Sequence, residues 1–417
     1  MPDMQGLQAP GRLGAAETLA ETLGPVLEFG SAMLAAGATA ERTHQAMSRI
    51  ARRCGPYRLS ASISVGAIAA TLAGDRSCAT TVAEVPSGGV DAAKISALDR
   101  FARNSDPLDG AGVLNFLASV SAVGRLHSPV LVALAVAAAC GCFAYLNKGD
   151  AADVVAAAIG GGVGQGARSA LGRFRLNAYA STAVTALVSA AVAAAASAAF
   201  VRLGLGDSES AVALISSVLF LIPGYPLVAA LLDLMRGQTL AASTRLLHAL
   251  GLLAVTAFCL AVVTHTAHLD LAATGSSESH GLLASGAATL VAAGSLAILF
   301  NSPRRTVFLV GALAAVGNVL RFALLDAGLS ASPSAFLGAF TIGVAASVLD
   351  RFLEEPRITL TVPAIIVMVP GLYAFRMLVL FNAGRVNEAL QDWAAGSFVI
   401  GAMAMGLAVA RVFASRD

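Results

Sequence analysis

Charged residues are scarce in this sequence: they make up 12% of its 417 residues, whereas 57% are hydrophobic. A soluble domain usually has about 25% charged residues. This composition therefore excludes an ordinary soluble protein and predicts a membrane protein with many spans. The net charge of +2 also excludes a strong global field that would attract nucleic acid.

Cysteine is scarce as well, and its five positions are too scattered for a disulfide framework or a zinc site. We therefore expect no metal and no cofactor. Residues 1–24 lack the basic segment and apolar core of a signal peptide. We find no catalytic motif that neighbouring residues support, so we expect no enzyme activity and no catalytic residue.

Residues 1–125 differ in composition from the rest and predict a cytoplasmic, soluble α+β domain. Charged residues interleave with apolar ones in helical patterns, and a stretch of alternating residues predicts strands. The expected elements are one or two helices within Leu19–Arg53, strands at Leu59–Leu72 and Cys78–Val85, and helices at Asp91–Asn104 and Val113–Val123.

After His127 the chain becomes a series of apolar segments, and a span needs about 20 such residues. Ten spans are predicted, at about 128–146, 151–170, 177–201, 210–234, 240–264, 282–301, 304–326, 333–352, 358–381 and 389–411. With the N-terminus in the cytoplasm, the inward loops and tail carry ten arginines, and the outward loops carry three basic residues. This bias favours a cytoplasmic N-terminus.

Two spans are interrupted near their middle, by Pro223-Gly224 and by Pro370-Gly371. Each break leaves backbone groups unpaired at membrane depth, which costs several kcal/mol unless protein, water or a ligand satisfies them. A proline kink explains one such break, but a matched pair in two halves is typical of a substrate pathway.

The spans divide into two sets of five, within 126–265 and 266–417. Because five is an odd number of crossings, the second set enters the membrane from the opposite side and is inverted relative to the first. The predicted fold class is a mostly α polytopic membrane protein. It has ten transmembrane helices as two inverted five-helix repeats, plus the N-terminal α+β domain.

Polar residues inside spans are costly and are therefore candidates for function. Gln165 and Asn318 occupy matched positions in the second and seventh spans, and each is followed one turn later by an arginine, Arg168 or Arg321. An amide and a guanidinium on one helix face can bind a carboxylate. The competing interpretation is that these arginines extend to the lipid headgroups.

Hydroxyl and charged residues near the breaks extend this candidate site. Serines precede the first break, Thr361 precedes the second, and Arg376 follows it. The hydroxyls can bond an amino acid or, alternatively, the carbonyls of their own helix. The candidate substrate-binding residues are Gln165, Ser216, Ser217, Pro223, Gly224, Asn318, Arg321, Thr361, Pro370, Gly371 and Arg376.

Asp233 lies near the inner end of the broken fourth span and is the candidate proton carrier. A carboxylate on that helix could take up a proton and couple transport to the proton gradient. The alternative is a capping or interfacial role.

The segment LAAGATAERTHQAMSRIARRCG at Leu34–Gly55, followed by SISVG at 62–66, resembles the N-terminal domain of the threonine/serine exporter family. The Pro-Gly spans and the ten-span layout are similar to that family too, so the resemblance covers nearly the whole chain. It implies a cytoplasmic N-terminal domain and export of threonine and serine driven by the proton motive force. In related systems the halves resemble separate proteins that together export succinate, which makes a dicarboxylate an alternative substrate.

We therefore expect a secondary transporter of the inner membrane that exports small amino acids by proton antiport. Its expected partners are the amino acid, protons, the lipid bilayer and a second copy of the chain, without nucleic acid. A passive channel and a membrane-embedded enzyme are the alternatives from other classes. The N-terminal domain either gates the cytoplasmic mouth or supports assembly.

Overall fold

The computed structural model describes residues 10–75, 77–86, 88–174, 176–206, 211–267, 281–353, 355–369, 371–382 and 384–414. Its contacts divide the chain into two compact units. The first consists of the residues up to Arg125 together with Leu232–Arg245, and the second of Leu126–Leu231 and the residues from Leu246 onward. The first unit thus includes a segment that the sequence pattern assigned to the membrane region.

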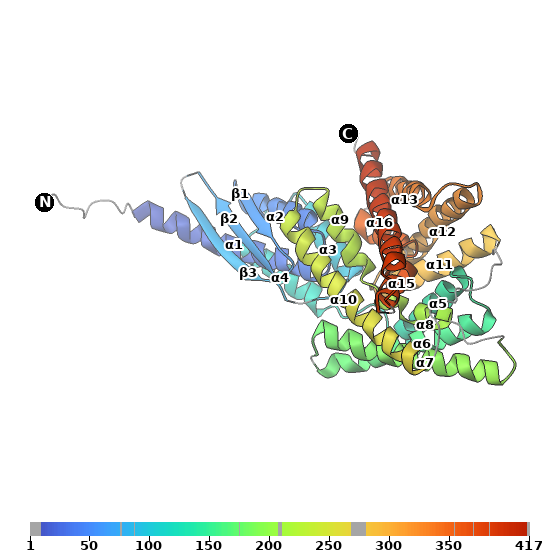
Figure 1. Ribbon diagram of the computed structural model, residues 1–417. Coiled ribbons are helices and arrows are strands. Elements are labelled where there is room, and N and C mark those ends of the chain that lie inside the picture. Colours follow the sequence, from blue (N-terminus) through green and yellow to red (C-terminus); the bar gives the residue numbers. More distant parts are fainter. Residues whose placement is uncertain are drawn as a thin grey trace. The chain divides into compact units, whose positions relative to one another are not determined.

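The first unit is an α+β fold of four helices and one antiparallel sheet in its N-terminal part, joined by residues 232–245. Helix α1 packs on strands β2 and β3, as Figure 1 shows. Its elements are α1 (Pro10–Ala35), α2 (Ala40–Cys54), β1 (Arg58–Ile63), β2 (Ala67–Ala73), β3 (Cys78–Glu84), α3 (Ala92–Arg103) and α4 (Gly110–Ala122). The prediction of one or two helices within Leu19–Arg53 is confirmed by α1 and α2, although α1 already begins at Pro10.

The prediction of one strand at Leu59–Leu72 is wrong, because two strands fill that stretch. A turn at Ser64 separates β1 from β2: the Ser64 hydroxyl accepts a hydrogen bond from the Ala67 N–H at 3.1 Å, and the Ser64 N–H donates to the Ala67 carbonyl. The strands pair antiparallel in the order β1-β2-β3. A serine turn followed by Gly66 reverses the chain, although the apolar alternation continues through it.

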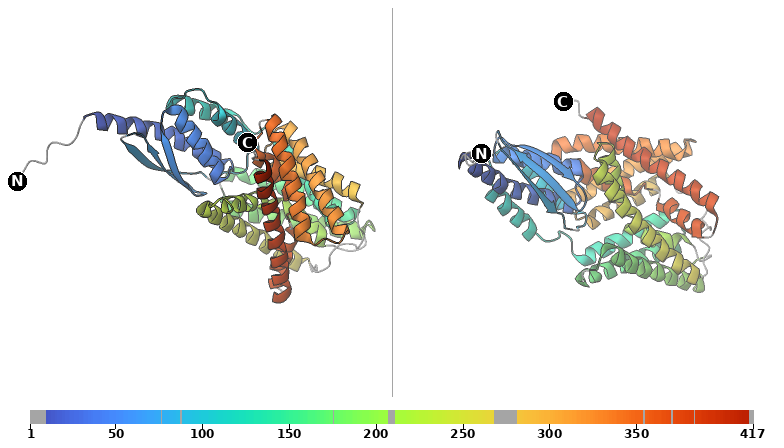
Figure 2. Two further views of the ribbon diagram at one scale, coloured as in Figure 1. Left: turned by 90° about the horizontal axis from the view of Figure 1, so that it is seen from above. Right: turned by 60° about the vertical axis from the view of Figure 1, so that its left-hand side comes forward.

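The second unit is all helical among the residues that the structure describes. Helices α12, α13 and α16 pack side by side, drawn orange to red in Figure 2. The end of α9 and the start of α10 belong to the first unit, and the rest of both helices belongs to the second. Short 3-10 turns lie at Gly172–Phe174 and Leu219–Leu221. The helices are α5 (Pro129–Leu146), α6 (Ala151–Leu171), α7 (Ala178–Arg202), α8 (Ala211–Val218), α9 (Gly224–Leu234), α10 (Thr239–Thr266), α11 (Leu282–Leu299), α12 (Arg304–Asp326), α13 (Ala331–Leu353), α14 (Arg357–Ile366), α15 (Gly371–Asn382) and α16 (Val386–Ala414).

Seven described helices are long and apolar enough to cross a membrane: α5, α7, α10, α11, α12, α13 and α16. The pair formed by Ala211–Leu221 and α9 makes an eighth candidate. Each of the ten predicted spans coincides with a helix or a helix pair, but α6 and the α14–α15 pair are not among these candidates. Polar residues lower the hydrophobicity of α6, and the second break interrupts the apolar run of α14 and α15.

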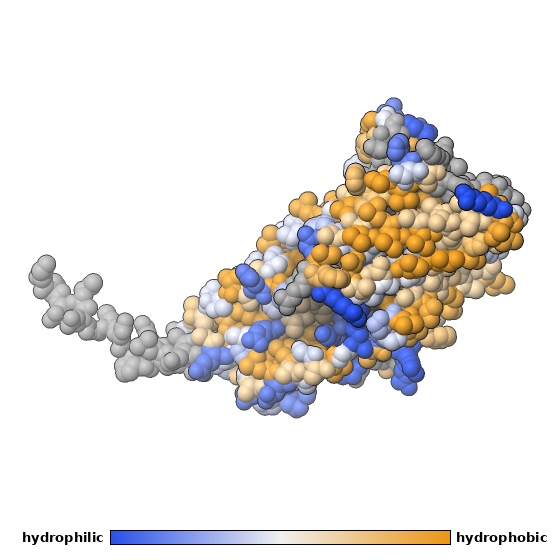
Figure 3. All heavy atoms as spheres, turned by 90° about the horizontal axis from the view of Figure 1, so that it is seen from below, coloured by the Kyte–Doolittle hydropathy of each residue, from blue (hydrophilic) through white to orange (hydrophobic). Residues whose placement is uncertain are grey.

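Large apolar side chains remain exposed on the helices, as lipid-facing surfaces require. Phe308 and Phe398 are examples, and Leu283 is 91% exposed. Figure 3 shows hydrophobic side chains gathered over a broad area of one face. These features identify a multi-pass membrane protein.

The glycine run of α6, from Gly160 to Gly166, serves close helix packing. A Cβ atom on Gly160 would lie 2.7 Å from the Ser189 carbonyl, and one on Gly164 would lie 2.7 Å from the Ser189 Cβ. The Ser189 hydroxyl donates to the carbonyls of Gly160 and Ser217, at 2.9 Å and 2.7 Å. Helices α6, α7 and α8 therefore approach at backbone distance.

Candidate functional site

Both predicted breaks interrupt their helices. At the first, α8 passes through a 3-10 turn, and the chain bends by 57° before α9 begins at Gly224. At the second, α14 ends at Ile366 and α15 begins at Gly371. Pro370 lies outside the described residues. Proline has no N–H to donate and disfavours helical geometry in the residue before it, which explains why the helices stop here.

The two breaks pack against each other in a reciprocal way. Ile366 is the last residue of α14, and a Cβ atom on Gly224 would lie 3.1 Å from its side chain. A Cβ atom on Gly371 would overlap the Ile222 side chain and lie 3.0 Å from Leu219. Each glycine thus leaves room for the residue that precedes the other break.

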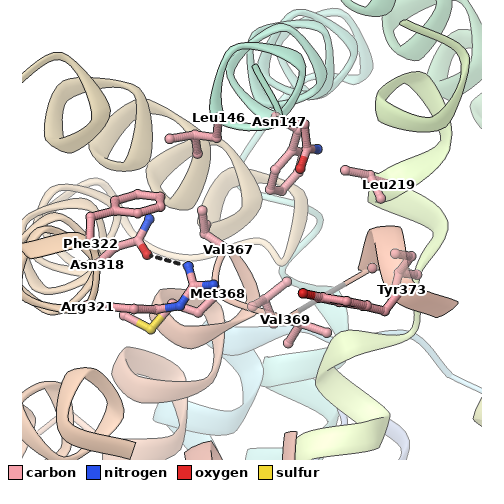
Figure 4. Close-up of a pocket in the computed structure, with 14 residues that line it drawn as sticks. Leu146, Asn147, Leu219, Asn318, Arg321, Phe322, Val367, Met368, Val369 and Tyr373 are labelled. Carbon is pink, nitrogen blue, oxygen red and sulfur yellow. Dashed lines mark hydrogen bonds between the residues drawn. The ribbon is translucent and has the colours of Figure 1, made fainter. Parts of the chain in front are cut away.

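A cavity of about 160 Å³ lies where the breaks meet. Its polar lining residues are Asn147, Asn318, Arg321 and Tyr373. Its other lining residues are Phe143, Leu146, Leu219, Ile222, Phe322, Ile366, Val367, Met368, Val369 and Gly371. Figure 4 shows Asn318 and Arg321 on one side of this pocket, with Leu219 and Tyr373 across from them.

Arg321 is the cationic residue of the pocket lining, which contains no aspartate or glutamate among the residues that the structure describes. Its Nη1 donates to Asn318 Oδ1 at 3.2 Å, the bond drawn dashed in Figure 4. Its Nε has no hydrogen-bond partner within the described chain. A guanidinium in a mostly apolar cavity, with donors left over, is suited to bind a carboxylate.

Asn318 is held in place by a relay of hydrogen bonds from α11. Its Nδ2 donates to Thr289 Oγ1 at 2.8 Å, and the Thr289 hydroxyl donates to the Ser285 carbonyl at 2.7 Å. Asn318 is therefore oriented with its Oδ1 toward Arg321. The prediction that an amide and a guanidinium share one helix face holds for this pair.

Sequence reasoning did not identify Asn147 and Tyr373, which complete the polar lining. Asn147 caps the end of α5, where Lys148 has a φ of 65° and the chain leaves the helix. Tyr373 follows Gly371 by two residues on α15. A polar residue at a helix end, and an aromatic hydroxyl just after a break, are the signals that a sequence offers for such positions.

Three of the predicted hydroxyl residues lie outside this pocket lining. The Ser217 hydroxyl donates to the Leu214 carbonyl at 2.7 Å, and the Thr361 hydroxyl donates to the Arg357 carbonyl at 2.8 Å. These two bond their own helices, the alternative that the sequence left open. Ser216 is fully buried, and its hydroxyl has no hydrogen-bond partner among the described residues.

Two further candidates are also absent from the pocket lining. Gln165 is buried in α6 and donates to the Ser169 hydroxyl at 3.4 Å. Arg376 forms an ion pair with Asp392 of α16, with 3.3 Å between Nε and Oδ2. Pro223 and Gly224 form the first break, but the cavity contacts their neighbours Leu219 and Ile222 instead.

Asp233 belongs to the first unit and does not line the pocket. Its carboxylate is fully buried and accepts a hydrogen bond from the Ala40 N–H at 3.1 Å. Arg245 of α10 is 3.5 Å away, measured from its Nε to Oδ2. Sequence reasoning did not identify Arg245, although a charged residue inside the predicted span 240–264 is the feature that could have indicated it.

Comparisons with known proteins cover both halves of the chain. A family model described as "Putative threonine/serine exporter" matches residues 25–267, and one described as "Threonine/Serine exporter, ThrE" matches residues 285–413. No solved structure matches the chain.

Two curated relatives are similar to parts of the chain. A protein of Escherichia coli (strain K12) named "Probable succinate transporter subunit YjjP" is 26% identical over 223 residues, which are 51% of this chain and 81% of that protein. A Haemophilus influenzae protein named "Uncharacterized protein" is 29% identical over 122 residues, which are 27% of this chain and 41% of that protein. The chain thus spans less than half of the second relative's length.

Proposed function

Because the chain belongs to the threonine/serine exporter family, we propose that it exports threonine and serine across the inner membrane by proton antiport. The pocket between the two breaks is the substrate site. It takes the substrate carboxylate at Arg321, and it releases the amino acid on the outer side.

The observation that carries this proposal is the meeting of the two breaks around a cationic residue. Helices broken near their middle supply donors and acceptors where a small polar solute needs them. The cavity of about 160 Å³ is large enough to hold a small solute. Arg321 and Asn318 then fix one end of that solute by charge-assisted hydrogen bonds.

The proposed topology has ten crossings, in which α6 and the α14–α15 pair join the eight candidate spans. Basic residues gather in the loops that would then face the cytoplasm, which supports a cytoplasmic N-terminus. The five-span halves, 126–265 and 266–417, would be inverted repeats that rock about the paired breaks. Such rocking exposes the pocket to one side of the membrane at a time.

Proton coupling is assigned to Asp233. It is a fully buried carboxylate at the end of the helix that starts at the first break. Protonation would neutralise the charge that faces Arg245. We expect Asp233→Asn to abolish uphill export while downhill exchange persists, and normal uphill export by this variant would exclude Asp233 as the proton carrier.

A short dicarboxylate is the second candidate substrate. It is favoured by the Escherichia coli relative, whose name describes a probable succinate transporter subunit. The pocket offers one guanidinium and no second cation among its described lining residues, so a second carboxylate would be left without a charged partner. The described lining also holds no carboxylate for the ammonium group of an amino acid, so the charge count alone does not separate the two solutes and the transport assay decides between them.

The test is a counterflow assay with purified protein in proteoliposomes, using labelled threonine, serine and succinate separately. We expect exchange of threonine and serine, and accumulation against a gradient when a pH difference is imposed. If the protein exchanges succinate but neither amino acid, the proposed substrate is wrong and a dicarboxylate takes its place. Accumulation that an uncoupler does not affect would refute proton antiport, and mere equilibration would indicate a passive channel.

A further inference from the structure

The turn between α1 and α2 is joined to residues 232–245 within one compact unit. Ala38, Ala40 and Asp233 have no exposed surface, and Arg245 is 7% exposed. This contact involves the segment that carries the family resemblance, Leu34–Gly55. We call the contact between Ala38–Glu41 and the residues Asp233, Arg236 and Arg245 the latch.

The latch satisfies the backbone at the start of α2. The first N–H groups of a helix have no partner within the helix. Thr39 caps one of them locally, since its hydroxyl accepts from the Arg42 N–H at 3.3 Å. The N–H groups of Ala40 and Glu41 instead donate to Asp233, at 3.1 Å for Ala40. The helix therefore depends on an acceptor that lies 193 residues away in the chain.

Charges in the latch are balanced in pairs. Arg245 faces Asp233 and also donates to the Ala38 carbonyl. Arg236 forms an ion pair with Glu41. Removing one member of a buried pair leaves an uncompensated charge. The buried Asp233–Arg245 pair is therefore more costly to break than the partly exposed Glu41–Arg236 pair.

We propose that the latch makes the N-terminal domain move together with α9 during transport. Asp233 lies on the same helix as Gly224 of the first break, about 14 Å along it at 1.5 Å per residue. A helix of that length is stiff, so a rotation at the break displaces Asp233 and with it the start of α2. This inference rests on the proposed function, because it assumes that the break moves during export.

The first experiment measures amide hydrogen exchange on the full-length protein in lipid nanodiscs, without substrate. Asp233→Ala should speed exchange at Ala40 and Glu41 by about tenfold or more, because each loses a charged acceptor. The control Thr39→Ala should speed exchange at Arg42 and leave the other two amides protected. Unchanged protection of Ala40 in Asp233→Ala would overturn the latch.

Charge exchange gives a second route if Asp233→Ala does not fold. The double variant Glu41→Arg with Arg236→Glu keeps an ion pair and should retain protection at Ala40. The double variant Asp233→Arg with Arg245→Asp keeps opposite charges but places a cation against the helix N–H groups. In this variant the protection of the Ala40 amide should fall about tenfold. Full protection of that amide would show that the ion pair alone is sufficient, and it would overturn the capping role of Asp233.

Coupling to the break is tested by Gly224→Val, whose side chain meets Ile366. We expect exchange at Ala40 to change by about threefold or more. Gly401→Val in α16 is the control, since a Cβ atom there meets nothing within 4 Å. No change in Gly224→Val would overturn the coupling. The readout uses no substrate, so a failed transport assay would refute the proposed function and leave this result standing.

Discussion

Replacing Arg321 by glutamine is the perturbation that bears most directly on the proposed substrate site. The arginine side chain lines the pocket, bonds Asn318 at 3.2 Å and keeps its Nε without a partner in the described chain. A hydrogen bond to a charged group contributes about 1.5–3 kcal/mol, and every 1.4 kcal/mol is a factor of ten. We therefore expect the half-saturating threonine concentration to rise roughly 10- to 150-fold.

The assay is concentration-dependent counterflow of labelled threonine, with Arg305→Gln as the matched control. Arg305 lies in the first turn of the same helix, is exposed and does not line the pocket. That variant should transport like the parent protein. Wild-type affinity in Arg321→Gln, or an equal loss in both variants, would refute carboxylate binding by Arg321.

Thermal stability provides an independent check on the same residue. Arg321 is partly buried, and a guanidinium whose buried Nε is unpaired destabilises the folded state, because its desolvation is only partly offset. Arg321→Gln should therefore melt no lower than the parent protein, whereas its transport falls. A marked drop in melting temperature together with lost transport would indicate that Arg321 has a structural role.

Three further predictions address packing, pairing and burial. Gly164→Ala should lower the melting temperature, because its Cβ would lie 2.7 Å from a serine on α7, whereas Gly166→Ala on the same helix meets nothing and should not. Arg376→Gln should destabilise the protein by about 1 kcal/mol, since its partly exposed ion-pair partner on α16 is left alone; an unchanged unfolding midpoint would show that the pair contributes nothing. Burial raises the pKa of the Cys54 thiol, so maleimide should label it more slowly at pH 7 than the exposed Cys78, and the rate should rise with pH. Equal labelling rates by mass spectrometry would contradict that burial.

Local features of the chain were predicted well from the sequence. Apolar segments, helix caps and Pro-Gly breaks are properties of neighbouring residues, so α2, α3 and the interruption at Gly224 lie where the pattern placed them. The strand error at Ser64 arose because alternation of small residues continued through the turn. The candidate spans are fewer than predicted where polar residues or a break divide the apolar run.

The candidate site was predicted only in part. Of the predicted candidates, Asn318, Arg321 and Gly371 line the pocket, but Gln165 at the matched position in the other half is buried in α6, where it donates to the Ser169 hydroxyl. Positions that match in the sequence pattern do not thereby acquire the same neighbours when the helices pack. Which hydroxyls bond their own helix, as Thr361 does, depends on the side-chain conformation that packing selects.

The sequence by itself determined that this is a membrane protein with an α+β N-terminal part and two broken apolar segments, because hydrophobicity and backbone propensity act over a few residues. Only the tertiary structure decided that the two breaks interlock at Gly224 and Gly371, and that Asp233 caps the start of α2. Those contacts join residues that are more than a hundred positions apart. They follow from how the helices pack, which no local pattern encodes.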